Sequence, residues 1–442
     1  MSTGVVWFRK DLRLADNPAW SAATRRHDQV IALFVIDPAL WDRVSDRRVR
    51  LLAGHLRSLD ASLRGLGAAL RTERGDPTAV VPEITASSGA EDVTANADVS
   101  PYAQRRDRTV AEHVDLDLHH GSLIHPPGSI LTAAGDRYRV FTPFSRTWFD
   151  TPLPRPPGPG DAEVRGESGR GIPETGPPPM EPGEAAAAGR LESFDPSRYP
   201  EERDRPDLDS TSRLSIDLKY GVLSPSTVAD HVGRESEAAR QFVRQLAWRD
   251  FHAHLLDERP DLVDHAMKPA YDAIAWREDE EGFEAWSRGL TGFPLVDAGM
   301  RQLLAEGWMH NRVRMVTASF LVKDLLIDWR KGERWFRRQL LDADVSQNVG
   351  NWQWVAGTGA DAAPYFRIFN PISQSRSFDP AGEYIRRWVP ELRGVRSEHI
   401  HEPWKAGPPD RTLWDGEGYP PPIVDHAEAR TRTLETYQAA LA

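Results

Sequence analysis

The sequence predicts an α/β domain followed by an all-α domain: an N-terminal doubly wound parallel sheet, a long connector and a C-terminal helical domain. Two short apolar runs, GVVWF at 4–8 and VIALFVI at 30–36, are typical of buried parallel strands. A leucine pattern of helical period follows at 51–70. Beyond Leu191 the strand pattern disappears, and amphipathic helical segments such as 238–256 and 293–307 take over.

The alternation of strand and helix predicts that the α/β domain covers residues 1–130, because such alternation builds sheets with helices on both faces. We take residues 131–190 as the interdomain connector and 191–442 as the helical domain. Within the connector, residues 151–190 are rich in Pro and Gly and poor in apolar side chains, so we expect them to be extended or mobile. A chain of 442 residues is long enough for two domains, each with a sizeable core.

Composition excludes several kinds of site. With 55 Lys and Arg against 66 Asp and Glu, the formal charge is −11, so any grip on nucleic acid must come from a local basic groove. No cysteine is present, which excludes disulfides, thiolate zinc sites and cysteine nucleophiles. The histidines lack acidic partners at HExxH-type spacing, and we expect no metal. No GxGxxG follows the first apolar run, so a Rossmann dinucleotide site there has little support.

No membrane segment is expected. The N-terminal apolar run meets Arg9 and Lys10 too soon for a signal peptide, and the run at 30–36 is too short to span a bilayer. We therefore expect a cytoplasmic protein.

The stretch 329–369 mixes tryptophans, arginines and paired aspartates in a way that core packing does not require. Asp342 and Asp344 flank one residue, Asn348 follows, and Trp352 precedes a Gly-rich turn at 357–359. Tryptophan is usually buried, whereas Arg and Asp resist burial unless paired, so the mixture predicts a site for a flat, charged and deeply held ligand. Each residue alone would more often pack in a core or form an ion pair.

Three segments here closely resemble the flavin domain of DNA photolyases and cryptochromes: GWMHNRVRMVTASFLVKDLL at 307–326, DLLIDWRKGERWF at 324–336 and GNWQWVAGTGADAAPYFRIFNP at 350–371. The resemblance runs from VVWFRKDLRLADNPAW at 5–20 to PPIVDHAEAR at 421–430 and is interrupted near 151–190. It looks nearest to the class I cyclobutane pyrimidine dimer photolyases of bacteria.

The resemblance implies bound FAD, active in its reduced form FADH⁻. The hydroxyl-rich segment 211–215 can cap a helix or donate to phosphate oxygens, and in the family the matching segment holds the pyrophosphate. Arg314 is the expected cationic partner of Asp342, and Asn348 matches the side chain that faces N5 of the flavin. The positions that match cofactor-binding residues are Tyr199, Thr211, Ser212, Arg213, Leu214, Ser215, Arg249, Trp308, Arg314, Asp342, Ala343, Asp344 and Asn348.

The resemblance also implies electron-transfer and substrate residues. Trp276, Trp329 and Trp352 match a chain of indoles that carries electrons between the flavin and the surface, although three independent core aromatics are the alternative. Residues expected at the reaction centre are Gln245, Trp248, Asn311, Met315 and Asn348. Residues expected to contact DNA are Arg203, Gln245, Trp248, Asn311, Arg312, Arg367 and Gln374. Trp248 is expected to stack on the extruded dimer, as in base flipping, for which photolyases are themselves a known example.

Two positions depart from the family pattern. Gln245 stands where class I enzymes usually have Glu, and an amide keeps hydrogen bonding but loses the charge and the transferable proton. Gln there resembles (6-4) photolyases and animal cryptochromes, whereas Met315 resembles the dimer-repairing enzymes. Tyr102 and Ala103 align with the Asn-Glu pair of folate-binding relatives, so the second, antenna chromophore is expected to be 8-hydroxy-5-deazaflavin or a similar pigment rather than folate.

The expected function is light-dependent repair of cyclobutane pyrimidine dimers, by electron transfer from excited reduced FAD to a flipped-out dimer. We expect a monomer that acts on UV-damaged single- or double-stranded DNA. The alternatives are a cryptochrome-like blue-light photoreceptor and a photolyase with shifted preference for the (6-4) photoproduct. A light-independent flavin reductase would need a nicotinamide site, for which the sequence has no motif.

Overall fold

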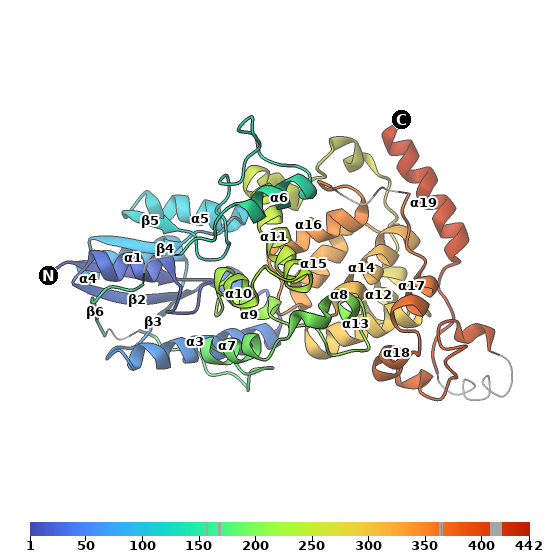
Figure 1. Cartoon of the computed structure of the whole chain (residues 1–442), viewed down its shortest axis with the longest axis horizontal. Coiled ribbons are helices and arrows are strands. Elements are labelled where there is room, and N and C mark those ends of the chain that lie inside the picture. The colour runs from blue at the N-terminus through green and yellow to red at the C-terminus, as the bar shows by residue number, and fades with distance from the viewer. Residues whose placement is uncertain (156–157, 167–168, 362–363, 365, 407–417) are drawn as a thin grey trace. The chain divides into compact units, whose positions relative to one another are not determined.

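The computed structural model describes residues 1–155, 158–166, 169–361, 364, 366–406 and 418–442 (Figure 1). Two compact units make up this chain. Unit 1 comprises Met1–Ser197 and Ser212–Pro260, and unit 2 comprises Arg198–Thr211 and Asp261–Ala442.

A parallel sheet forms the centre of unit 1. Its strands run in the order β3-β2-β1-β4-β5, and β6 pairs with β2 beside them. The predicted strands at 4–8 and 30–36 are confirmed as β1 and β2, and all six residues of β1 are buried, as expected for a strand covered on both faces. The strands are β1 Thr3–Phe8, β2 Gln29–Ile36, β3 Arg71–Arg74, β4 Asp92–Asn96, β5 Leu116–His119 and β6 Glu163–Val164.

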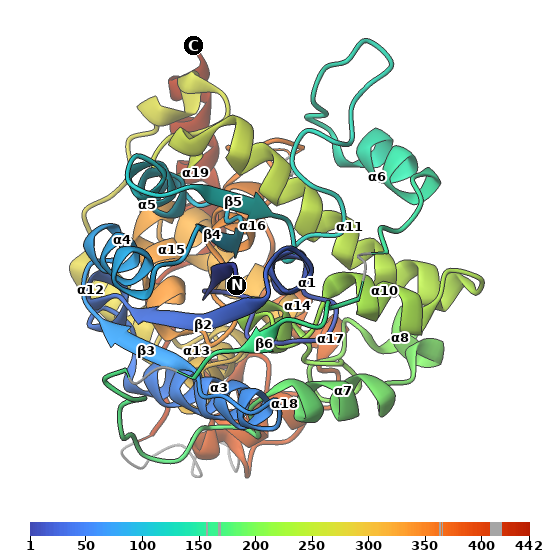
Figure 2. The same cartoon turned by 90° about the vertical axis from the view of Figure 1, so that its left-hand side faces the viewer.

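Helices cover both faces of this sheet. Right-handed crossovers place α1 and α3 on one face and α4 and α5 on the other, as Figure 2 shows for α1 against α4 and α5. Several of these helices begin with a capping side chain followed by proline, namely at Asn17, Asp37, Asp76 and Ser100. The helices of unit 1 are α1 Pro18–Arg26, α2 Pro38–Trp41, α3 Asp46–Arg64, α4 Pro77–Ser88, α5 Pro101–Ala111, α6 Phe141–Asp150, α7 Glu184–Glu192, α9 Ser215–Tyr220, α10 Pro225–Val232 and α11 Glu237–Glu258.

The helix predicted at 51–70 ends earlier, at Arg64. Gly67 has a φ of 93°, a conformation that leaves the helix and is open to glycine at little strain. The following residues enter β3 at Arg71 instead. Here the leucine period was correct and the boundary was wrong.

The Pro- and Gly-rich connector, residues 151–190, has no helix before Glu184 where it is described, and its last residues begin α7. The amide of Glu163 donates to the Asp28 carbonyl at 2.9 Å, and that of Arg170 donates to the Thr72 carbonyl at 2.7 Å. The Glu184 carboxylate, in the first turn of α7, accepts from the amides of Leu14 and Ala15 at 3.0 and 3.1 Å. Backbone hydrogen bonds therefore hold this segment to unit 1 despite its shortage of apolar side chains.

Unit 2 is helical. The predicted segment at 293–307 is confirmed as α13, and the segment at 238–256 as α11 of unit 1. None of the helices in the described ranges is long and apolar enough to cross a membrane. The helices of unit 2 are α8 Tyr199–Glu202, α12 Glu280–Arg288, α13 Pro294–Glu306, α14 Asn311–Ser319, the π-helix η4 Phe320–Asp324, α15 Trp329–Gln339, α16 Val345–Ala356, α17 Pro371–Phe378, α18 Glu383–Trp388 and α19 His426–Leu441.

Candidate cofactor and substrate site

Asp344 fixes the start of α16 and thereby the position of Asn348. Its Oδ1 accepts from the amide and the hydroxyl of Ser346 at 3.1 and 2.7 Å, which makes it an N-cap. One turn further on, the amide nitrogen of Asn348 donates to the carbonyl of Glu333 at 3.0 Å and to its Oε1 at 2.8 Å. The buried Asn348 amide is therefore held in one orientation.

Glu333, which the sequence did not single out, is the partner of the candidate residue Asn348. Burial raises the pKa of its carboxyl group, and Arg337, at 3.2 Å, partly opposes this shift. The spacing of Glu333 in the sequence could have indicated its burial. It lies four residues after Trp329 and three before Phe336, and so on the buried face of the highly charged helix α15. A carboxylate on such a face needs a specific partner, which here includes Asn348.

The ion pair expected between Arg314 and Asp342 is present. Arg314 Nη1 and Nη2 meet the two carboxylate oxygens of Asp342 at 3.1 and 2.8 Å, and Arg314 Nε donates to the Met309 carbonyl at 2.7 Å. This two-pronged geometry fixes both side chains. It joins α14 to the loop before α16, where Ala343 is also buried.

The three candidate electron-transfer tryptophans differ in burial. Trp352 and Trp329 are 2% and 1% exposed, whereas Trp276 is partly exposed. Trp352 lies so close to Gly332 that an added Cβ there would be 2.3 Å from its ring. A helix with any other residue at position 332 would displace this indole. Two buried tryptophans and a third that is partly exposed agree with an electron-transfer path that ends at the surface. The electron-transfer role of these three residues stays a prediction.

Arg312, one of the expected substrate residues of unit 2, already has partners within the protein. Arg312 pairs with both oxygens of Asp204 at 3.2 and 2.8 Å and stacks over Phe378. A phosphate contact by Arg312 must therefore compete with a carboxylate.

Other predicted residues of unit 2 make weaker contacts. Arg203 lies 5.2 Å from the ring of Tyr199, and Arg367 lies 5.7 Å from that of Phe369. Asn311 Nδ2 is 3.9 Å from Met315 Sδ, and buried Trp308 packs against His310. Oε1 of Gln374 is buried without a hydrogen-bond partner among the described residues, so it is available as an acceptor. Residues 362, 363 and 365 of the resemblance segment lie outside the described residues.

In unit 1, α11 brings Gln245, Trp248 and Arg249 to one helix face, since they are three and four residues apart. Gln245 Nε2 donates to the Gln241 carbonyl at 3.0 Å, and Arg249 Nη2 donates to the Leu218 carbonyl at 3.3 Å. The Trp248 ring is stacked on Phe141, with centroids 3.6 Å apart and planes 11° apart. One face of Trp248 is thus occupied by the protein itself.

The hydroxyl-rich segment 211–215 has the features of an anion-binding loop. Arg213 has a φ of 53°, which is uncommon for a non-glycine residue, and such strain clusters at ligand sites. The Ser212 hydroxyl accepts from the Leu214 amide at 3.4 Å, just before α9 begins at Ser215. Ser210 Oγ is buried without a hydrogen-bond partner in the described chain. These donors fit the pyrophosphate of a dinucleotide such as FAD.

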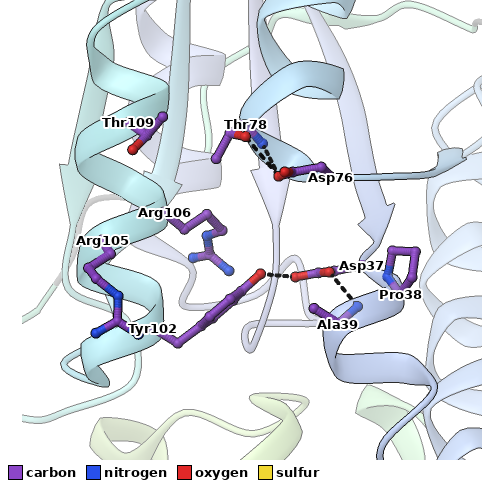
Figure 3. A pocket seen from close by; sticks show the side chains of 9 residues that line it. All are labelled: Asp37, Pro38, Ala39, Asp76, Thr78, Tyr102, Arg105, Arg106 and Thr109. Atoms are coloured by element: carbon purple, nitrogen blue, oxygen red, sulfur yellow. Dashed lines mark hydrogen bonds between the residues drawn. The ribbon is translucent and has the colours of Figure 1, made fainter.

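A pocket of about 450 Å³ lies in unit 1 at the carboxyl ends of β2 and β3. Figure 3 shows Tyr102 and Arg106 of α5 on one side and Asp37 and Asp76 on the other, with the Tyr102 hydroxyl bonded to Asp37. Burial, and then this hydrogen bond, raises the pKa of Tyr102. The pocket is lined by Asp37, Pro38, Ala39, Asp76, Thr78, Tyr102, Arg105, Arg106 and Thr109.

Next to this pocket, the indole of Trp7 lies near two guanidinium groups. Arg9 and Arg106 each have Cζ 4.7 Å from its ring centroid, and both pair with Asp107. The pocket thus combines cations, hydroxyls and carboxylates, as a site for a polar aromatic ligand requires. No group of three or more His, Asp or Glu side chains suited to a metal ion occurs in the part of the chain that the structure describes.

Comparison with known proteins decides the family. A model of the DNA photolyase domain matches residues 4–160, and a model of the FAD binding domain of DNA photolyase matches residues 242–439. The deoxyribodipyrimidine photo-lyase of Escherichia coli K12 is 39% identical, over 100% of this chain and 99% of that protein. The chain belongs to the DNA photolyase family.

Solved photolyase structures have the same fold. The class III photolyase of Agrobacterium tumefaciens matches with a TM-score of 0.92 and 38% identity, covering 100% of this chain and 98% of that one. The Sulfolobus tokodaii photolyase, solved with two FAD molecules, matches with a TM-score of 0.87 and 31% identity, covering 99% and 100%. The photolyase resemblance, the two-part fold class and the FAD-binding domain expected from the sequence are confirmed.

Proposed function

We propose that this protein is a deoxyribodipyrimidine photo-lyase, a carbon–carbon lyase that uses light to split cyclobutane pyrimidine dimers in DNA. The observation that carries the proposal is the fixed amide of Asn348, bonded twice to Glu333 within the region that matches the FAD-binding domain. A buried amide held in this way can interact with a flavin ring nitrogen without moving. The relatives named for this activity match the chain over its whole length.

In this proposal the residues of unit 2 hold the cofactor. Reduced FAD, when bound and excited by light, supplies the electron that opens the dimer. Arg314 and Asp342 hold each other in place beside the flavin ring and ribose, and Asn348 is the amide directed to N5. Trp308 and Tyr199 would contact the same cofactor. Position and electrostatics are the protein's contribution, since no side chain needs to act as a nucleophile.

The remaining cofactor contacts come from segment 211–215 and from α11. Thr211, Ser212 and Ser215 would donate to the pyrophosphate, and the turn at Arg213 presents their hydroxyls and amides. Arg249 would neutralise negative charge on the same ligand. These assignments rest on the chemistry of the donors and on the strained turn.

For the substrate, we propose that Trp248 stacks on the flipped dimer with the ring face that Phe141 leaves uncovered. Gln245, one helical turn away, would donate Nε2–H to a pyrimidine carbonyl and accept at Oε1. Asn311 and Met315 would line the same reaction centre. Arg203, Arg312, Arg367 and Gln374 would contact the DNA backbone, single- or double-stranded, with the protein acting as a monomer.

The pocket of unit 1 is the proposed site of the antenna pigment. Its volume of about 450 Å³ suits one fused-ring ligand, and the charged groups of Arg105, Arg106, Asp37 and Asp76 can bind polar groups on its edge. Position 102 offers a tyrosine hydroxyl instead of the amide found in folate-binding relatives, and its oxygen is already bonded to Asp37. We therefore favour 8-hydroxy-5-deazaflavin, whose 8-hydroxyl group can ionise, over folate. The Sulfolobus tokodaii photolyase, with its two FAD molecules, supports a flavin-like pigment in this family.

The domain division at residues 130 and 190 and the cytoplasmic location are further parts of the proposal. The division assigns residues 191–442 to one helical domain, whereas compact unit 1 also contains residues 191–197 and 212–260, which include α9, α10 and α11. The location follows from the proposed substrate, which is DNA.

The test is repair of a UV-irradiated oligo(dT) by purified protein under near-UV light, with the same mixture kept dark as control. Light-dependent loss of dimers is the expected result. Unchanged dimers with fully reduced FAD would overturn the proposal in favour of a blue-light photoreceptor. The absorption spectrum of the same preparation distinguishes a deazaflavin from a folate.

A further inference from the structure

Trp248, the proposed stacking residue, is covered on one ring face by the first residue of α6. The rings of Phe141 and Trp248 lie nearly parallel, with centroids 3.6 Å apart and planes 11° apart. Phe141 is 1% exposed, whereas Trp248 is partly exposed on α11. The protein therefore supports this indole from one side and leaves part of it open to a ligand.

The position of Phe141 depends on tertiary contacts. It begins α6, and the N-cap residue Val140 makes no capping hydrogen bond through its side chain, so the helix end has no local side-chain support. Phe141, Phe144 and Trp148 recur at helical spacing and are all buried. They form the face of α6 that packs against α11 (Figure 1). The packing of this face therefore decides where Phe141 lies.

The other end of the same face is attached to a buried carboxylate of α11. Trp148 Nε1 donates to Oδ2 of Asp250 at 2.8 Å. The backbone amides of Ile124 and His125 donate to the same carboxylate at 3.2 and 2.9 Å. Asp250 and Trp148 are both 0% exposed. One carboxylate thus joins α11 to α6 and to the loop that follows β5.

The hydrogen bonds to Asp250 are needed because burial of a carboxylate costs free energy unless donors surround it. Burial raises the pKa of Asp250 to about 6, and the bond from Trp148 opposes this shift more strongly than either backbone amide does. The indole of Trp148 is therefore the side chain that stabilises this buried charge, and the contact holds α6 in one position on α11.

We propose that three residues position Trp248 for stacking on a pyrimidine dimer: Phe141, Trp148 and Asp250. Asp250 anchors Trp148 and with it α6, and Phe141 at the start of α6 holds the Trp248 ring in one plane. An indole that is already fixed in its binding orientation loses less conformational freedom when a flipped base stacks on it. In this proposal none of the three residues contacts the dimer itself. The inference rests on the proposed repair function, because it assigns how Trp248 is prepared for that substrate.

The first experiment observes the orientation of Trp248 without DNA and without light. In holoenzyme labelled with 5-fluorotryptophan, fluorine NMR records the indoles, and Trp248→Phe identifies the signal of Trp248. Phe141→Leu removes the stacked ring and keeps apolar bulk. Phe144→Leu is the matched control: Phe144 is also buried in α6 and also contacts Phe251, but within the described chain its ring does not meet that of Trp248.

We expect the Trp248 signal to shift and broaden in Phe141→Leu, because the ring current of Phe141 is lost and the indole samples several orientations. Phe144→Leu should keep the wild-type signal. Trp148→Phe removes the N–H donor to Asp250 but keeps an aromatic ring, so it should broaden the Trp248 signal less than Phe141→Leu does.

The second experiment measures binding and repair separately. In the dark, Phe141→Leu should weaken the binding of irradiated oligo(dT) about tenfold, within the range that base–aromatic stacking contributes. Binding of undamaged oligo(dT) and the FAD content should stay at the wild-type values, which a general loss of structure would not allow. At saturating substrate under near-UV light, the quantum yield of enzyme reduced beforehand should stay within about twofold of the wild type, since the loss falls on binding.

Two outcomes would overturn the proposal. A wild-type Trp248 signal in Phe141→Leu would show that the stacked ring does not hold the indole. Equal affinities of Phe141→Leu and Phe144→Leu for irradiated oligo(dT) would show that this support does not serve the substrate. Should Phe141→Leu not fold, Trp148→Phe takes its place, and a wild-type signal or affinity in that variant would overturn the proposal equally. Failure of the proposed function is a separate result, because dimers would then persist under light with the wild type itself.

Discussion

The side-chain amide of Asn348 donates to two oxygens of one residue, the carbonyl and the carboxylate of Glu333, at 3.0 and 2.8 Å. These two hydrogen bonds connect the first turns of α16 to the middle of α15. They also determine which side-chain atom of Asn348 remains available to a ligand. With its nitrogen engaged, Asn348 presents Oδ1 to a ligand as an acceptor. The orientation of this residue is therefore a property of Glu333 as much as of Asn348.

Glu333→Met should loosen this contact. The variant keeps the backbone acceptor but leaves one Asn348 hydrogen unbonded, a loss that costs about 1–3 kcal/mol for a buried group. Glu333→Gln is the matched control because its carbonyl oxygen can still accept. Urea unfolding midpoints of the holoenzyme measure the effect, and equal midpoints for the Met and Gln variants would contradict it.

Arg314→Lys should weaken FAD retention. Lysine replaces the two-pronged pair with Asp342 by one contact and loses the bond to the Met309 carbonyl, so we expect affinity to fall about tenfold, or about 1.4 kcal/mol. Arg301→Lys is the control, since Arg301 pairs with Glu391 on the surface, where such pairs contribute little. Flavin fluorescence released during dialysis measures retention. The same loss in both variants would exclude a specific role for Arg314.

Gln245→Glu should raise the repair yield per absorbed photon, because a carboxyl group beside the dimer adds a transferable proton and a charge that the amide lacks. Gln241→Glu, one turn earlier on α11, is the control for added charge alone. Quantum yields on irradiated oligo(dT) with pre-reduced enzyme measure the effect. Equal quantum yields for Gln245→Glu and the wild type would show that the amide does not reduce repair.

Trp276→Phe should slow the photoreduction of oxidised FAD while repair by enzyme reduced beforehand is spared. A phenyl ring is much harder to oxidise than an indole, so the path to the surface is interrupted at its partly exposed end. Trp388→Phe on α18 is the matched control. Flavin absorbance under blue light follows the rate, and an unaltered rate in Trp276→Phe would remove this residue from the path.

His310→Asn should reduce the dependence of the free energy of unfolding on pH below about pH 6.5. His310 Nδ1 accepts from the Arg312 amide at the start of α14, and burial lowers the pKa of His310 to about 4. Below pH 6.5, the ordinary pKa of histidine, His310 binds a proton in the unfolded chain but stays neutral in the folded protein. The free energy of unfolding therefore decreases as the pH falls from about 6.5 to 4. The loss approaches about 3 kcal/mol for one residue.

Asparagine caps the helix equally well and does not titrate over this range. The free energy of unfolding of His310→Asn should therefore decrease less than that of the wild type between pH 6.5 and 4. The check is a series of urea titrations across that range. Parallel profiles for the two proteins would show that His310 is not responsible for the slope.

Some features were determined by the sequence alone. Apolar runs of strand length gave β1 and β2, because strands covered on both faces must be apolar throughout. Helical periodicity gave α11 and α13, since one face of each must meet a core. The residues quoted for the photolyase resemblance pointed to the family and to the pair of Arg314 and Asp342.

Only the tertiary structure decided which side chains face one another. In the sequence, Glu333 is one of several charged residues in a charged helix. Its contact with Asn348 becomes visible only in the structure, where α15 packs against α16. Lys323 and Tyr437 lie more than a hundred residues apart, and only the π-helix and α19 bring them to one carbonyl oxygen. Local pattern follows from the period of each element, whereas contacts between distant residues depend on how whole elements pack.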